Sequence, residues 1–107
     1  MRQYYHKLVR DKIPEIIAQA GKSYEIKTLS EDEYLQALNN KLLEEAKEVV
    51  QAEPEDLLKE LGDLFEVIDH ILIAYNISRG TIINCQQKRR KERGSFTKRI
   101  QLVWTET

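Results

Sequence analysis

The hydrophobic residues of this chain recur mostly three and four positions apart, a spacing typical of amphipathic α-helices. Pro14 suits the first turn of a short helix, and Gly21 supplies its end. Ser30 and Glu33 form a capping box that opens a longer helix, and Pro54 opens the next one. The pattern therefore predicts helices over residues 14–20, 31–52, 54–76 and 79–93, the last capped by Ser78 and closed by Gly94.

Two stretches follow a different period. Tyr24, Ile26 and Thr28 alternate with polar residues and predict a short strand, and residues 100–104 alternate in the same way near the C-terminus. We therefore expect one all-α domain over residues 1–107, a bundle of about four helices with short extended terminal segments. The two long helices are joined by only a few residues around Pro54, so they should pack as a central antiparallel hairpin.

A carboxylate interrupts the apolar face of the first long helix. At about 100° per residue, Leu35, Leu42 and Val49 gather within roughly 80° of Leu38 and define that face. Glu45 falls inside it, about 20° from Leu38. An unpaired charge out of water is costly, so a carboxylate at this position requires a partner or a ligand.

The same feature recurs in the second long helix. Glu60 lies in the apolar arc between Leu64 and Val67, and Asp63 lies on its margin. An antiparallel hairpin brings the end of the first long helix beside the start of the second. Four acidic side chains then point at one seam, namely Glu45, Glu48, Glu60 and Asp63.

Composition limits the classes of function. The chain is 41% hydrophobic and 33% charged with only four glycines and two prolines, which suits a helical soluble protein. A net charge of −1 gives no overall reason to expect nucleic acid or an anionic membrane as partner. No apolar run reaches the roughly 18 residues of a membrane span, and Cys85 is the only cysteine. We expect a cytoplasmic protein.

The acidic seam predicts a hard cation. Carboxylate oxygens without a nearby cysteine suit Mg²⁺ or Mn²⁺ far better than Zn²⁺. Protein-bound Mg²⁺ usually retains waters and binds substrate phosphates, so the site points towards phosphate chemistry.

Four motifs in order carry a resemblance that covers nearly the whole chain. "EEAKE" at residues 44–48 and "ELGD" at residues 60–63 resemble the EExxE…ExxD signature of the MazG-like all-α NTP pyrophosphohydrolases. The opening "YHKLVRDKIPEII" and the closing "KRRKERGSFTKRI" resemble a compact branch of that superfamily, the phosphoribosyl-ATP pyrophosphohydrolase-like, house-cleaning NTP pyrophosphatases. The resemblance implies Mg²⁺ ligands and a supporting or water-activating carboxylate: ligands Glu45, Glu48, Glu60 and Asp63, with Glu44 and Glu45 in catalysis.

Basic residues are segregated from the acidic seam. Residues 44–69 hold ten acidic residues and two lysines, whereas residues 88–99 hold seven cations and one acid. Cations near the seam could hold the oxygens of a triphosphate. The candidates from both ends of the chain are Lys7, Arg10, Lys12, Lys88, Arg90, Lys91 and Arg93.

These features predict a Mg²⁺-dependent hydrolase that cleaves a nucleoside triphosphate to the monophosphate and pyrophosphate. Two alternatives remain: a phosphoribosyl-ATP pyrophosphohydrolase of histidine synthesis, or a non-enzymatic helical module that binds nucleic acid through its basic segment.

Leu43, Val50 and Ile73 lie well outside the apolar faces of the hairpin. Helices that are apolar on more than one side need further neighbours, so we expect a homodimer or a higher homo-oligomer.

Overall fold

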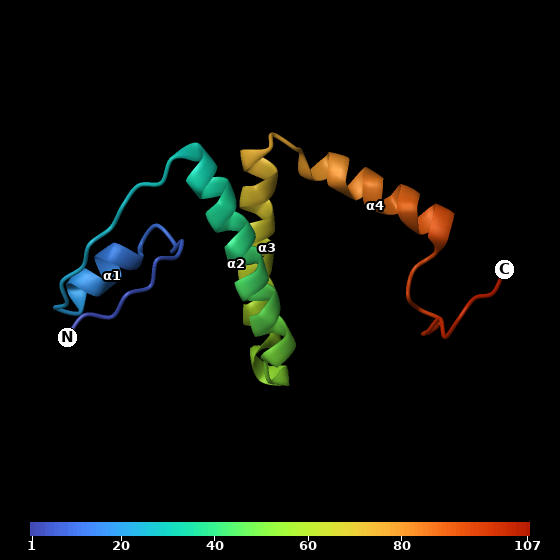
Figure 1. The fold of residues 1–107 in the computed structure, drawn as a ribbon, viewed down its shortest axis with the longest axis horizontal. Coiled ribbons are helices and arrows are strands. Elements are labelled where there is room, and N and C mark those ends of the chain that lie inside the picture. The colour runs from blue at the N-terminus through green and yellow to red at the C-terminus, as the bar shows by residue number, and fades with distance from the viewer.

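Local capping residues set the ends of the helices. The computed structural model describes residues 1–107. At the start of the first long helix, the Ser30 hydroxyl accepts a hydrogen bond from the Glu33 amide, and the Glu33 carboxylate accepts one from the Ser30 amide. Gly94 ends the last helix with a φ of 80° that glycine adopts without strain. The helices are α1 (Ile13–Gln19), α2 (Glu31–Gln51), α3 (Leu57–Ala74) and α4 (Arg79–Arg93), with a 3₁₀ turn η1 (Pro54–Asp56) before α3 (Figure 1).

The prediction of an all-α fold is confirmed, and the prediction of a strand is wrong. Residues 24–28 and 100–104 form no strand. Alternating hydrophobicity makes a segment suitable for a sheet, but a strand is stable only when a neighbouring strand pairs with its backbone. The two segments do not pair with each other or with any other part of the chain.

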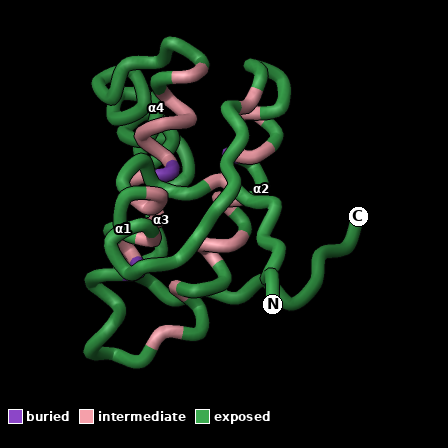
Figure 2. Tube along the Cα trace, turned by 90° about the vertical axis from the view of Figure 1, so that its left-hand side faces the viewer, coloured by how far each residue is buried: buried purple, intermediate pink, exposed green.

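α2 and α3 form the antiparallel hairpin that η1 connects (Figure 1). Leu38 of α2 and Val67 of α3 are the only buried hydrophobic residues, with 2% and 8% of their surface exposed. Figure 2 shows that intermediate and buried positions concentrate on these two helices, while most of the remaining chain is exposed. The core of the single chain is therefore one layer between two helices.

The helices do not assemble into a compact four-helix bundle within one chain. Only α2 and α3 pack against each other along their length. α1 and α4 lie on opposite sides of the hairpin along the longest axis of the molecule (Figure 1). The resulting extents are 61 × 33 × 28 Å. None of the helices combines the length and the apolar character needed to cross a bilayer.

Candidate metal centre

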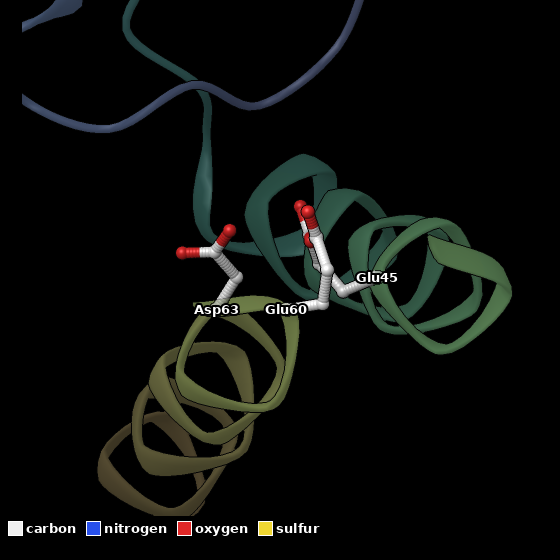
Figure 3. Close-up of side chains that lie close together, drawn as sticks. All are labelled: Glu45, Glu60 and Asp63. Atoms are coloured by element: carbon white, nitrogen blue, oxygen red, sulfur yellow. The ribbon is translucent and has the colours of Figure 1, made fainter. Parts of the chain in front are cut away.

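Three carboxylates from the two hairpin helices converge at one place. Each of Glu45 on α2 and Glu60 and Asp63 on α3 contributes an oxygen, and these three oxygens lie within 4.8 Å of one another (Figure 3). The three-residue spacing from Glu60 to Asp63 puts both on neighbouring parts of one helix surface. The antiparallel packing of α2 then supplies Glu45, so the acidic cluster is a product of the hairpin.

Glu60 is the most deeply buried member of this cluster. Only 9% of its surface is exposed, and its Oε1 lies 3.6 Å from the Nζ of Lys59. Its Oε2 is buried without any hydrogen-bond partner. A buried carboxylate oxygen in this state carries an uncompensated desolvation penalty, which a cation or a bound water would remove.

Glu45 is also largely removed from solvent, with 12% of its side chain exposed. Burial raises the pKa of the Glu45 carboxyl above its usual range. Lys41 opposes this shift, because its Nζ lies 3.6 Å from Oε1 of Glu45. The nearby carboxylates of Asp63, Glu48 and Glu44 raise the pKa further. The negative charge of the cluster is thus poorly balanced, which favours the binding of a cation.

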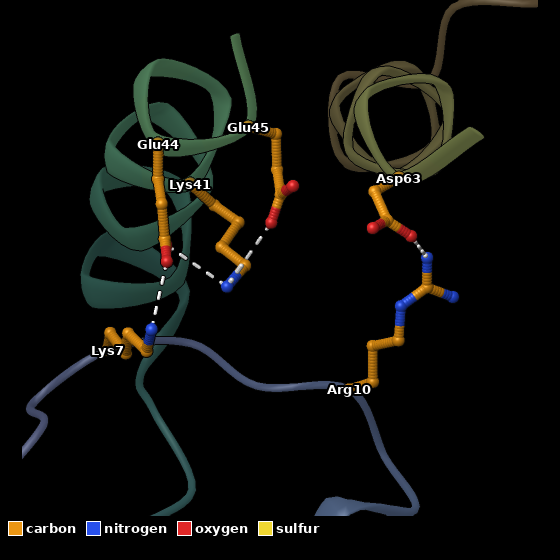
Figure 4. Close-up of polar contacts among 6 residues, drawn as sticks. All are labelled: Lys7, Arg10, Lys41, Glu44, Glu45 and Asp63. Carbon is orange, nitrogen blue, oxygen red and sulfur yellow. Dashed lines mark hydrogen bonds and ion pairs between the residues drawn. The ribbon is translucent and has the colours of Figure 1, made fainter. Parts of the chain in front are cut away.

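The N-terminal segment, residues 1–12, approaches this acidic surface at Lys7 and Arg10 (Figure 4). The Nζ of Lys7 donates to Glu44 over 2.9 Å, and Nη2 of Arg10 donates to Asp63 over 2.8 Å. Residues far apart in the sequence therefore meet at one site. Two of the basic residues predicted to hold phosphate lie directly at the carboxylates.

Glu44 is held in its charged form. The hydrogen bond from Lys7 lowers the pKa of the Glu44 carboxyl; burial opposes this shift, and a hydrogen bond of 3.1 Å from Lys41 adds to it. The same hydrogen bond raises the pKa of Lys7. Glu44 therefore stays an acceptor at the edge of the cluster rather than a member of it.

Other predicted residues lie outside the cluster. Glu48 is exposed and does not share the 4.8 Å grouping, although its charge contributes to the raised pKa of Glu45. Lys12 is exposed at the start of α1 and forms no ion pair. Exposed positions on α4 hold Lys88, Arg90, Lys91 and Arg93, and Figure 1 shows that α4 runs away from the hairpin.

Two lysines at the site were missed by the sequence reasoning. Lys41 contacts both Glu44 and Glu45, and Lys59 contacts Glu60. The signal for Lys41 was present, because it precedes Glu44 and Glu45 by three and four residues on one helix. Only 18% of the Lys41 side chain is exposed, so it is part of the site rather than a solvated surface residue.

The donor set fits a hard divalent cation. All three converging side chains offer carboxylate oxygens, and Glu60 Oε2 has no protein partner. The free cysteine lies on α4, outside the hairpin. Mg²⁺ and Mn²⁺ prefer such oxygen ligands, and Mg²⁺ tolerates a partial protein shell because it retains waters.

Comparison with known proteins adds one relative. An uncharacterized protein of Mycolicibacterium smegmatis is 49% identical over 55 residues, a match that spans 51% of this chain and 56% of that protein. No protein-family model matches the chain. No solved structure matches it either.

Proposed function

We propose that this chain is a MazG-like, Mg²⁺-dependent nucleoside triphosphate pyrophosphohydrolase that releases a nucleoside monophosphate and pyrophosphate. The observation that carries the metal requirement is the convergence of Glu45, Glu60 and Asp63 around the unpartnered Oε2 of Glu60. The reaction type rests on the "EEAKE" and "ELGD" motifs, whose residues supply this cluster.

Glu45, Glu60 and Asp63 would hold the cation. When bound, Mg²⁺ would neutralise phosphate charge and lower the pKa of a coordinated water. Glu44 stays ionised beside the cluster because Lys7 and Lys41 donate to it. An ionised carboxylate at this position can accept a hydrogen bond from the attacking water and orient it. Glu48 remains a further candidate ligand.

The N-terminal cations would bind the phosphates. Lys7 and Arg10 are already at the carboxylates, each with donors that a phosphate oxygen could accept. A small hollow between the N-terminal segment and α2 is lined by Lys7, Asn40 and Lys41 together with the Glu44 carboxylate that both lysines pair with. Charged and amide donors on its wall suit an anionic group. Binding of phosphate would compete with the Lys7–Glu44 and Arg10–Asp63 pairs.

The decisive experiment measures pyrophosphate release from a panel of nucleoside triphosphates, with phosphoribosyl-ATP included, in the presence and absence of Mg²⁺. Release that depends on Mg²⁺ is expected. Turnover confined to phosphoribosyl-ATP would assign the chain to histidine synthesis. Binding of nucleic acid that weakens steeply with salt, without any metal-dependent turnover, would mark the non-enzymatic alternative.

A matched pair of variants tests the site. Glu45→Gln changes the charge with little change in volume and should abolish turnover. Glu66→Gln removes one negative charge from α3, where Glu66 pairs with His70 and lies outside the cluster, and should preserve turnover. Normal turnover in Glu45→Gln would exclude this carboxylate from the site.

A further inference from the structure

Two cations of the N-terminal segment attach it to the hairpin. Lys7 Nζ lies 2.9 Å from Oε1 of Glu44 on α2, and Arg10 Nη2 lies 2.8 Å from Oδ1 of Asp63 on α3. Lys7 and Arg10 therefore link the segment to both helices of the hairpin (Figure 4). No other hydrogen bond or ion pair joins residues 1–12 to α2 or α3. The polar attachment of the segment depends on these two pairs alone.

Both pairs are exposed enough to exchange for other ligands. Of the side-chain surface, 44% is exposed in Lys7 and 59% in Arg10. An exposed ion pair contributes little net stability, because water solvates its separated charges almost as well. Either cation can therefore leave its carboxylate for a stronger ligand at small cost.

Arg10 stands at a carboxylate that a metal ion needs. Asp63 is one of the three side chains whose oxygens converge within 4.8 Å, and Arg10 donates to it. The deeper Oε2 of Glu60 has no partner at all. The guanidinium of arginine is always charged, so it compensates Asp63 and also repels any other cation that approaches the cluster. The outer part of the cluster is thus neutralised by a residue of the chain itself, while the inner part is not.

A phosphate group is a stronger ligand for Arg10 than one exposed carboxylate. It accepts two parallel hydrogen bonds from a guanidinium and carries more negative charge than a carboxylate at neutral pH. When Arg10 turns to phosphate, Asp63 becomes free to bind a metal ion. When a metal ion neutralises Asp63, Arg10 becomes free to bind phosphate. Coupling between two ligands is reciprocal, so each must strengthen the binding of the other by the same factor.

We propose that Arg10 is a built-in counter-cation of the metal centre, which keeps the empty cluster at low affinity for a divalent cation until a phosphate ligand draws Arg10 off Asp63. The pair between Lys7 and Glu44, outside the cluster, keeps the segment near the site during this exchange. The device favours loading of metal and phosphate together over binding of the metal alone. The inference rests on the proposed function in taking the cluster as a cation site, but it requires no hydrolysis.

Two other roles of Arg10 predict different metal affinities. If Arg10 positioned Asp63 for the metal ion, its removal would weaken metal binding. If the metal ion only bridged carboxylates and phosphate, removal of Arg10 would leave metal binding without phosphate unchanged. A counter-cation alone predicts tighter metal binding when its charge is removed. The sign of the change in Kd therefore distinguishes the three roles.

Binding of Mn²⁺ to the full chain, followed by electron paramagnetic resonance of the free ion, measures this sign. Without phosphate, Arg10→Ala should lower the Kd for Mn²⁺ by about tenfold, the scale of a unit charge acting on a divalent ion across an exposed, screened surface. Arg10→Lys keeps the charge and should stay close to the native Kd. Arg2→Ala removes the same type of side chain from an exposed position of the same segment that forms no ion pair, and it should match the native chain.

Saturating inorganic phosphate completes the test, with a protein-free titration that corrects for complexes of Mn²⁺ with phosphate. Phosphate should lower the Kd for Mn²⁺ more in the native chain than in Arg10→Ala, because the variant has no Arg10 to withdraw. A Kd in Arg10→Ala equal to or higher than the native value, or an equal phosphate effect in both chains, would overturn this proposal and leave the metal centre in place. Failure of both the native chain and Arg10→Ala to bind Mn²⁺ would overturn the metal centre and this proposal together.

Discussion

Replacing Glu60 with glutamine should stabilise the chain in the absence of metal and weaken its response to Mg²⁺. Glu60 shares a 4.8 Å cluster with two other carboxylates, and its Oε2 is buried without a partner. A glutamine of nearly the same shape removes the negative charge and adds an amide that can donate to a neighbouring carboxylate. The variant therefore removes repulsion without opening a cavity.

The magnitude follows from the geometry. Two unit charges 4.8 Å apart repel by about 3.5 kcal/mol at an effective dielectric of 20 and by about 0.9 kcal/mol in bulk water. Lys41 and Lys59, each 3.6 Å from a carboxylate of the cluster, offset part of this repulsion. Asp63 is one-third exposed and already paired with Arg10, which screens it further. We expect a net gain of about 1–2 kcal/mol in the free energy of unfolding.

Thermal unfolding measured by circular dichroism with and without Mg²⁺ checks this prediction. Without metal the Tm of Glu60→Gln should rise by about 4–8 °C per kcal/mol. In the native sequence, Mg²⁺ at 100 times its Kd should add about 2.7 kcal/mol, and most of this gain should be lost in the variant.

Glu66→Gln serves as the control, because it removes a carboxylate from the same helix outside the cluster. Its Tm should change little, and its Mg²⁺ response should match that of the native chain. A lower Tm for Glu60→Gln, or an unchanged response to Mg²⁺, would refute the assignment of Glu60 as an electrostatically strained metal ligand.

Four further predictions address other parts of the chain. Arg10→Ala should lower kcat/KM by about tenfold or more, because Arg10 lies at the carboxylates and would lose one charge-assisted contact to phosphate. Ser30→Ala should cost about 1 kcal/mol in denaturant unfolding, because the hydroxyl caps α2. Gly62→Ala should raise stability by about 0.5–1 kcal/mol, since an added methyl group meets nothing within 4 Å in a helix interior. The lowered pKa of Glu44 means that its pairing stabilises the fold above its ordinary pKa of 4.5 and is lost as the pH falls below that value. The raised pKa of Lys7 adds stability below pH 10.5 that is lost on further alkalinisation, so Lys7→Met should flatten both limbs of a plot of Tm against pH.

Control variants distinguish each of these effects from a general effect of the substitution. Lys98→Ala removes a cation beyond α4, and equal kinetic losses in it and in Arg10→Ala would point to general charge rather than a specific contact. Ser30→Gly should cost only a few tenths of a kcal/mol, and a loss as large as that of the alanine variant would contradict the capping argument. A destabilised Gly62→Ala would show that another chain approaches this position closely. An unchanged pH profile in Lys7→Met would mean that the exposed pair contributes nothing measurable.

The positions of the helices could be predicted from the sequence alone, because they depend on local residues. The ends of α2 and α4 follow from capping by Ser30 and Ser78 and from the stop at Gly94, and these depend only on residues within one turn. The helical period also put Glu45 and Glu60 on the inner faces of two helices with a short connection. Their approach to each other was therefore predictable before any tertiary contact was known.

Tertiary structure decided what depends on partners distant in the sequence. Residues 24–28 alternate like a strand and form none, because no second strand pairs with them. Whether Glu48 or Asp63 completes the cluster depends on the rotation of each helix within the hairpin, which periodicity defines only to within a few tens of degrees. The approach of Lys7 and Arg10 to the carboxylates, and the direction of α4 away from them, are set by the path of the chain in space, because no local sequence signal encodes either.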